Sequence, residues 1–119
     1  MKDKSANERF ALNQRIVQKE SEIDDFQQIH RDVEKALNEF EIEMRSHFQR
    51  LQDSYETMMA MGSSKAKWEE ADRQSKQAHL VRMLAENRDE LGRYYIRTLQ
   101  NLDEEKNQLQ KERDDLPWD

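Results

Sequence analysis

An apolar seam with alternating spacings of three and four residues runs through the first sixty residues of this chain, and it constrains the fold most. Neither Gly nor Pro interrupts the chain before Gly62. Seven successive heptads predict a coiled-coil-like helix over about residues 6–61, roughly 80 Å long at 1.5 Å per residue. One seam line holds Ile16, Ile23, His30, Leu37, Met44, Leu51 and Met58, and the other holds Leu12, Lys19, Phe26, Val33, Phe40, His47, Ser54 and Met61.

The sequence also indicates where this helix begins and how wide its apolar seam is. Ser5-Ala6-Asn7-Glu8 fits a capping box, in which the Ser hydroxyl and the Glu carboxylate satisfy free backbone amides. Apolar residues also flank the seam, which indicates packing against more than one neighbouring helix. The flanking residues are Ile29 and Ala36 on one side and Phe48 and Tyr55 on the other.

A second helix is expected after Gly62-Ser63-Ser64, over about residues 65–114. Gly suits the left-handed position that ends a helix, and either Ser can cap the next one. Pro117 then prevents the helix from continuing through residues 115–119. The predicted seam of this helix holds Trp68, Ala71, Ser75, Ala78, Val81, Leu84, Leu91, Tyr95, Thr98, Leu102 and Leu109.

Two amphipathic helices of similar length, joined by about three residues, predict an all-α, long antiparallel two-helix hairpin. A straight rod is the alternative, but it would expose the Met cluster near Gly62 unless a second chain covered it. We expect residues 1–119 to form a single domain that dimerisation or partner helices complete.

Composition excludes several classes of function. Of 119 residues, 39% are charged and 34% hydrophobic, and the net charge of −6 does not favour nucleic acid as a partner. No apolar run suits membrane insertion or a signal peptide, so the sequence predicts a cytoplasmic protein. The chain has no Cys, which excludes disulfide and thiolate chemistry.

Catalytic and metal-binding patterns are not found. The chain has three His, and neither a Glu-x-x-His pair nor a His-x-x-x-His pair involves them. His30 and His47 fall in the first seam, where partly buried His residues set the register of a coiled coil. There is no Gly-rich phosphate loop or nucleophile motif. The sequence therefore predicts a protein that is not an enzyme and has no cofactor or metal.

Aromatic and Met residues point instead to protein binding. Two helices have too narrow an interior for all of them, and both residue types are enriched at interfaces. They pack either within a wider end of the hairpin, in a homodimer, or against a different protein. The residues expected to contact a partner are Phe48, Tyr55, Met59, Trp68, Tyr94, Tyr95 and Trp118.

The pattern resembles the small helical-hairpin proteins of Gram-positive type VII (Esx) secretion, and among them the α-helical partners of LXG-domain toxins. The resemblance covers the whole chain and rests on the Gly-Ser bend at 61–64, on Trp68 and on Tyr94-Tyr95-Ile96-Arg97. WXG-type members carry Trp-x-Gly in the bend, which this chain lacks. Their Tyr-x-x-x-Asp/Glu export motif has an aromatic analogue here in Trp68 and Asp72, so the resemblance implies that Asp72 also contacts a partner.

The resemblance implies an adaptor or chaperone that lies along the helical N-terminal domain of an LXG-type toxin and helps deliver it to type VII secretion. It also implies a second small helical protein that supplies the export signal, and co-export without a cleaved signal peptide. The competing expectation from the residues is a homo-oligomeric structural coiled coil without cargo.

Overall fold

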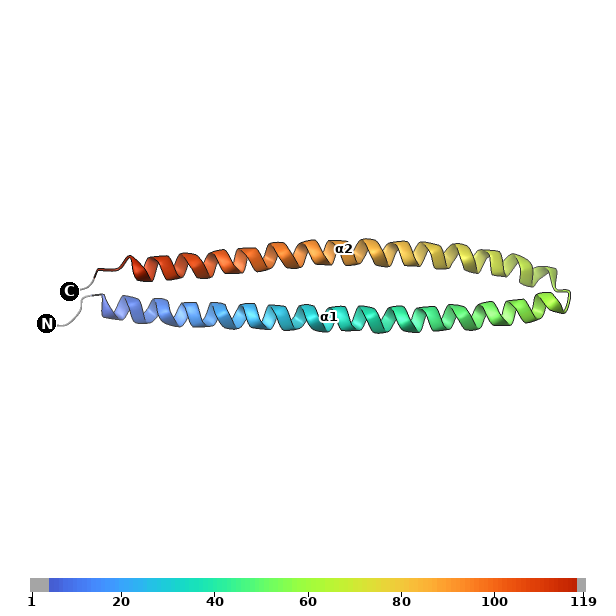
Figure 1. The fold of residues 1–119 in the computed structure, drawn as a ribbon, viewed down its shortest axis with the longest axis horizontal. Helices are drawn as coiled ribbons and strands as arrows, with labels where there is room; N and C mark the ends of the chain where they lie inside the picture. Colours follow the sequence, from blue (N-terminus) through green and yellow to red (C-terminus); the bar gives the residue numbers. More distant parts are fainter. Residues whose placement is uncertain (1–4, 118–119) are drawn as a thin grey trace. The chain divides into compact units, whose positions relative to one another are not determined.

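The computed structural model describes residues 5–117, which form two α-helices joined by a short turn (Figure 1). Helix α1 spans Ala6–Ala60 and helix α2 spans Ser64–Asp114. Hydrogen bonds from Lys19 to Glu105 and from Arg88 to Glu41 show that α2 runs antiparallel to α1. The fold is therefore the all-α antiparallel two-helix hairpin that two amphipathic helices with a short linker predicted.

The turn between the helices has the backbone geometry that its sequence demands. Gly62 adopts a φ of 90°, a left-handed conformation that Gly reaches without a Cβ penalty. The N–H of Ser63 donates to the carbonyl of Met58 at 3.1 Å, and the N–H of Gly62 donates to the carbonyl of Met59 at 2.9 Å. This pair of bonds is a Schellman motif. The Ser63 hydroxyl then accepts from the N–H of Ala66 at 3.1 Å, so the predicted Gly stop and Ser cap are confirmed.

The hairpin divides into two compact units. Unit 1 comprises residues 1–32 and 92–119, of which 5–32 and 92–117 are described, and unit 2 comprises residues 33–91. Each unit pairs a segment of α1 with a segment of α2, so each has its own interior.

Unit 1 buries the predicted seam. Ile16, Ile23 and Leu109 are buried, and Leu12 and Phe26 are half-buried beside them. Both seam lines of α1 therefore face α2 in this unit. Polar groups hold the open end together, where the Arg9 guanidinium donates to the carbonyl of Pro117 at 3.1 Å and Arg113 donates to the Asn13 side chain at 3.1 Å.

Unit 2 buries a different set of positions. Met44 and Ala66 are its buried apolar residues, and two charged residues of α2, Glu70 and Arg73, are each only 7% exposed. The half-buried apolar side chains of α1 in this unit are Leu37, Phe48, Leu51, Tyr55 and Met59.

The prediction for the second seam line of α1 is wrong in unit 2. Phe40 is 52% exposed, and His47 and Ser54 are exposed as well. The physical reason is that an α-helix has 3.6 residues per turn, so a strict seven-residue repeat drifts by about 20° per heptad. After several heptads the line has rotated off the contact, and residues one position later, such as Phe48 and Tyr55, face α2 instead.

The seam predicted for the start of α2 is also wrong. Trp68, Ala71, Ser75 and Ala78 are all exposed. The positions that face α1 are Ala66, Glu70, Arg73 and Gln77, which also have helical spacing. Charged and amide side chains thus occupy an interior that sequence pattern assigned to small and apolar ones.

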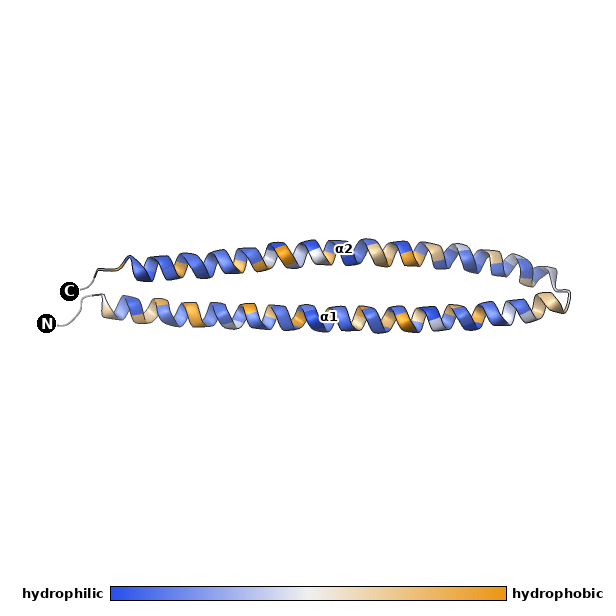
Figure 2. Ribbon diagram, viewed as in Figure 1, coloured by the Kyte–Doolittle hydropathy of each residue, from blue (hydrophilic) through white to orange (hydrophobic). Residues whose placement is uncertain are grey.

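Many apolar side chains remain on the surface of the hairpin. The chain exposes 9253 Å², whereas a folded monomeric protein of its mass exposes about 6,800 Å². Figure 2 shows hydrophobic positions distributed along both helices. The exposed large hydrophobic residues of the described ranges include Phe10, Val17, Ile29, Phe40, Ile42, Met61, Trp68, Met83, Tyr94 and Ile96. This exposure suggests a protein partner or self-association.

Candidate protein-binding surface

The most exposed apolar side chains of the described residues lie at the turn. Met61 is 81% exposed and Trp68 is 70% exposed. The Schellman motif fixes the backbone at Met61, and Trp68 follows one helical turn after α2 begins at Ser64. Both side chains are therefore presented by an ordered backbone. We call Met61 and Trp68 the turn pair.

The Met cluster before the turn is arranged differently from its heptad prediction. Met58 and Met61 were assigned to the seam, but Met58 is 41% exposed and Met61 is in the turn. Met59, predicted to be free for a partner, is half-buried instead. The same drift of the heptad repeat explains this exchange, because residue 59 has rotated into the contact that residue 58 has left.

Phe48 and Tyr55, two further predicted partner residues, are half-buried on the face of α1 that meets α2. They are spaced seven residues apart, which places them on the same side of α1. Part of each side chain therefore contributes to the interior of unit 2, and only the remaining part is available to another protein.

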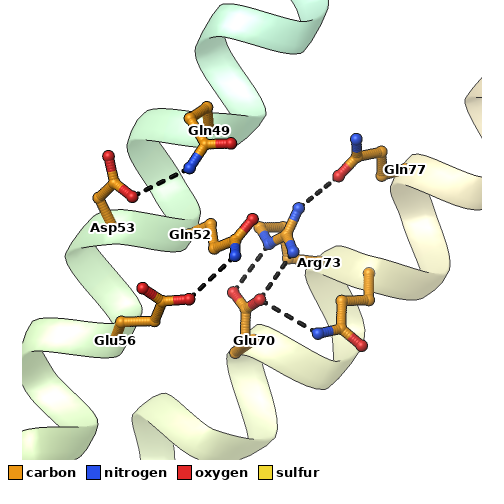
Figure 3. Close-up of polar contacts among 8 residues, drawn as sticks. Gln49, Gln52, Asp53, Glu56, Glu70, Arg73 and Gln77 are labelled. Carbon is orange, nitrogen blue, oxygen red and sulfur yellow. Dashed lines mark hydrogen bonds and ion pairs between the residues drawn. The ribbon is translucent and has the colours of Figure 1, made fainter.

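A polar layer lies in unit 2 between the turn and Phe48 (Figure 3). The Arg73 guanidinium donates two hydrogen bonds to the Glu70 carboxylate, at 2.8 Å and 2.7 Å, and a third to the side chain of Gln77. Arg73 also interacts electrostatically with Glu56 of α1. A forked Arg–carboxylate pair satisfies both charges at once, which permits their burial.

The polar layer changes the acidity of its members. The pKa of the Glu70 carboxyl lies below its usual value because Arg73 donates hydrogen bonds to it, an effect that its burial opposes and a bond from Gln74 supports. The pKa of Arg73 is raised, chiefly by the same bonds to Glu70. Both groups are therefore held in their charged forms inside the helix pair.

Asp72, the predicted analogue of an export-motif acid, is on the outer side of α2. Its carboxylate accepts a salt bridge from Lys76 at 2.8 Å, and the Asp72 side chain is 41% exposed. The pKa of Lys76 is raised because of its hydrogen bond to Asp72. Asp72 and Trp68 are one turn apart on the same helix, and Trp68 is the more exposed of the two.

The two adjacent tyrosines of unit 1 have different environments. Tyr95 stacks between two aromatic rings of α1, with centroids 5.4 Å from Phe26 and 3.7 Å from His30. Tyr94 makes one edge contact with Phe26 at 6.3 Å and is 55% exposed. Tyr94 is therefore open to a partner, whereas Tyr95 is committed to the interior of unit 1. Trp118, the last predicted partner residue, lies outside the described residues.

A second apolar surface, on one side of unit 2, was hidden from sequence reasoning because its α1 members were assigned to the seam. Phe40, Met44 and His47 of α1 line a shallow groove together with Leu80 of α2. We call this side of unit 2 the Phe40 face. The exposed apolar residues that line this groove, 38–68% exposed, are Phe40, Ile42 and Leu80. The seven-residue repeat could have revealed this surface, because the angle by which the repeat drifts around an α-helix can be calculated.

Within residues 5–117 no group of three or more His, Asp or Glu side chains could hold a metal ion. No helix in that range is long and apolar enough to cross a membrane. His30 stacks on Tyr95, and His47 lies on the Phe40 face.

Comparison with known proteins adds no family to this description. A scan against protein-family models, a search of curated proteins and a search of solved structures found no significant match to the chain.

Proposed function

We propose that this chain is a non-enzymatic protein-binding module whose exposed apolar and aromatic side chains contact helices of a different protein. The turn pair is the observation that carries this proposal. Met61 and Trp68 are 81% and 70% exposed, yet Met61 is held by an ordered turn and Trp68 lies within helix α2. Removing such side chains from water is favourable by about 25 cal/mol per Å² of apolar area. Exposed Trp and Met are also the residue types that dominate the energetics of interfaces.

We infer the kind of partner from the resemblance to the small helical partners of LXG-domain toxins. The features behind it are the Gly-Ser bend, Trp68 and the Tyr94-Tyr95 stretch. The proposed partner is the helical N-terminal domain of an LXG-type toxin. In this proposal the chain covers apolar surface of that domain, keeps it soluble and helps deliver it to type VII secretion, with a second small helical protein supplying the export signal.

Co-expression of the chain with the N-terminal domain of an LXG-type toxin encoded beside it tests both parts of the proposal. We expect a stable complex whose mass, measured by light scattering, equals the sum of the partners. Replacing Trp68 by Ala should weaken binding by about 30-fold, as for a buried interface aromatic. Val17→Ala is the matched control, because Val17 is 62% exposed but lies in unit 1.

Three results would count against the proposal. Failure of the two proteins to associate, or a genomic neighbourhood without a toxin gene, would remove the secretion role. Equal binding by the Trp68→Ala and wild-type chains would remove the turn pair from the interface. Circular dichroism of the variant should match that of the wild type, because Trp68 contributes little to the interior.

A further inference from the structure

We propose that the indole of Trp118 binds a groove on α1 in unit 1, which we call the Phe10 groove. The groove is lined by Phe10, Asn13, Gln14, Val17 and Gln18. Trp118 lies outside the described residues and follows the last of them, Pro117, in the sequence. The proposal does not rest on the turn pair or on a toxin partner, because the contacts that support it all lie within unit 1.

The first step concerns the apolar floor of the groove. Phe10 and Val17 are 63% and 62% exposed, and their spacing of seven residues places them on one side of α1. Helix α2 covers a different side of α1, where Ile16 is buried and Leu12 is half-buried. Residues 5–117 therefore leave two large apolar side chains of the groove in water, although covering them is favourable.

The second step concerns the chemistry of the lining. None of the five lining residues is charged, although 39% of the chain is charged. The rim consists of the side-chain amides of Asn13, Gln14 and Gln18. An indole suits this combination, because its apolar body needs cover and its N–H needs an acceptor such as an amide oxygen. The groove is thus suited to a neutral aromatic side chain.

The third step identifies Trp118 as the occupant. Two hydrogen bonds hold the C-terminal end of the chain beside the groove. Arg113 donates to Asn13, itself a lining residue, at 3.1 Å, and Arg9 donates to the carbonyl of Pro117 at 3.1 Å. Asn13 follows Arg9 by four residues, so the two lie on the same side of α1. The peptide bond that begins at this carbonyl leads directly to Trp118.

The remaining residues outside the described range are poorer occupants. Residues 1–4 are Met-Lys-Asp-Lys, three of which are charged, and Asp119 is charged as well. The hydrogen bond at Pro117 also favours Trp118, because a side chain tethered one residue from its site has a high effective concentration there. Docking of Trp118 gives unit 1 an aromatic cover and leaves Trp68 as the tryptophan that is available to a partner protein.

Tryptophan fluorescence of the full-length Trp68→Phe chain tests the proposal, because the sequence has two Trp and this variant keeps Trp118 alone. We expect acrylamide to quench Trp118 about three-fold less effectively than it quenches the free peptide Leu-Pro-Trp-Asp, since a docked indole buries much of its surface. The protection should be independent of protein concentration. Nuclear Overhauser effects between the indole protons and the Val17 methyl groups should place the ring in the groove without any substitution there.

Val17→Asp in the same background puts a carboxylate in the floor of the groove, and it should bring quenching to the value of the free peptide. Ile29→Asp is the matched control, because Ile29 is also an exposed β-branched residue of α1 in unit 1, at 59%, but does not line the groove. It should leave the protection unchanged, and circular dichroism should show that both variants remain helical.

Four results would overturn the proposal. They are quenching of the Trp68→Phe chain equal to that of the free peptide, protection that survives Val17→Asp, equal loss of protection in Ile29→Asp, and absence of the Overhauser effects to Val17. Protection that disappears on dilution would likewise overturn it, since Trp118 would then bind a second copy of the chain.

Discussion

Units 1 and 2 are both antiparallel pairs of helical segments, yet they distribute apolar and charged side chains in opposite ways. Unit 1 buries Ile16, Ile23 and Leu109, and charged residues such as Lys19 and Glu105 line the groove along one of its sides. Unit 2 buries the Glu70–Arg73 ion pair and leaves Phe40 52% exposed in its groove. Both units expose apolar side chains, but among the described residues unit 2 exposes ten large hydrophobic residues and unit 1 exposes five.

The difference shows how one seven-residue repeat produces two surfaces. In unit 1 the lines through Ile16 and Phe26 both lie within the helix contact, because they straddle its centre. The second line has rotated out of that contact by Phe40, at about 20° per heptad. The same repeat thus places apolar side chains in the core of unit 1 and leaves Phe40 exposed on the surface of unit 2.

The largest expected effect tests whether unit 1 depends on its core. Ile23→Asp places a carboxylate at a position that is 8% exposed and removes a buried aliphatic side chain. We expect a loss of about 3–4 kcal/mol in the free energy of unfolding. Chemical denaturation followed by circular dichroism measures it.

Ile29→Asp provides the control within the same helix and unit. Ile29 is 59% exposed, so its replacement should change the free energy of unfolding by less than about 0.5 kcal/mol. Equal losses for the two variants would show that unit 1 has no distinct buried side, and the contrast with unit 2 would disappear.

Sequence reasoning reached this part of the fold because the relevant signals are local or periodic. Gly62 and Ser63 define the turn through their own backbone chemistry, and the positions of Ile16 and Ile23 follow from spacing. Sequence reasoning failed farther along α1, where the small angular drift of each heptad has accumulated. Assigning Phe40 to the seam requires the repeat to be 3.5 rather than 3.6 residues per turn over several heptads.

The next effect concerns the polar interior of unit 2. Arg73→Leu leaves the Glu70 carboxylate buried without the two hydrogen bonds that it now accepts. We expect a loss of about 2 kcal/mol in the free energy of unfolding. Replacing both Glu70 and Arg73 by Leu should recover most of this loss, because apolar residues of similar volume often substitute for a buried ion pair.

A double-mutant cycle on the same denaturation assay measures the coupling between Glu70 and Arg73. Lys76→Leu is the comparison, since the Asp72–Lys76 salt bridge is exposed to solvent, and the midpoint of unfolding should stay within error of the wild type. If the double variant were as unstable as Arg73→Leu alone, the interior of unit 2 would not tolerate apolar packing at this level.

A smaller effect separates the two neighbouring tyrosines of unit 1. Tyr95→Leu removes the ring that stacks on Phe26 and His30, and we expect a loss of about 1 kcal/mol in unfolding free energy. Tyr94→Leu removes a ring that is 55% exposed and should cost less than about 0.5 kcal/mol. Thermal melts of the two variants check this order, and a reversed order would place Tyr94 in the interior.

These residues also show what sequence could reveal of the candidate binding surface. Trp68 and Tyr94 were predicted as partner residues and are exposed, whereas Tyr95 and Met59 were predicted alongside them and are partly enclosed. Residue type gave the same prediction for the neighbouring Tyr94 and Tyr95, because Tyr suits both interiors and interfaces. The angular position of each side chain decides between the two, and that depends on the register of helix pairing.

The smallest expected effect is the acid sensitivity of the interior of unit 2. The pKa of Glu70 is lower in the folded chain than its usual 4.5, because of the hydrogen bonds from Arg73. The folded state therefore binds fewer protons than the unfolded state near this pH, and the stability that Glu70 provides is lost as pH falls below about 4.5.

Between pH 6 and pH 3, the wild type should lose about 2 °C more in Tm than Glu70→Gln, which cannot titrate at this position. Glu69→Gln, altered at the adjacent and more exposed carboxylate, should follow the wild type. Equal losses for wild type and Glu70→Gln would mean that the ion pair is as accessible to water as the charges on the surface of unit 1. The distinction between an apolar and a polar interior would then have no energetic consequence in acid.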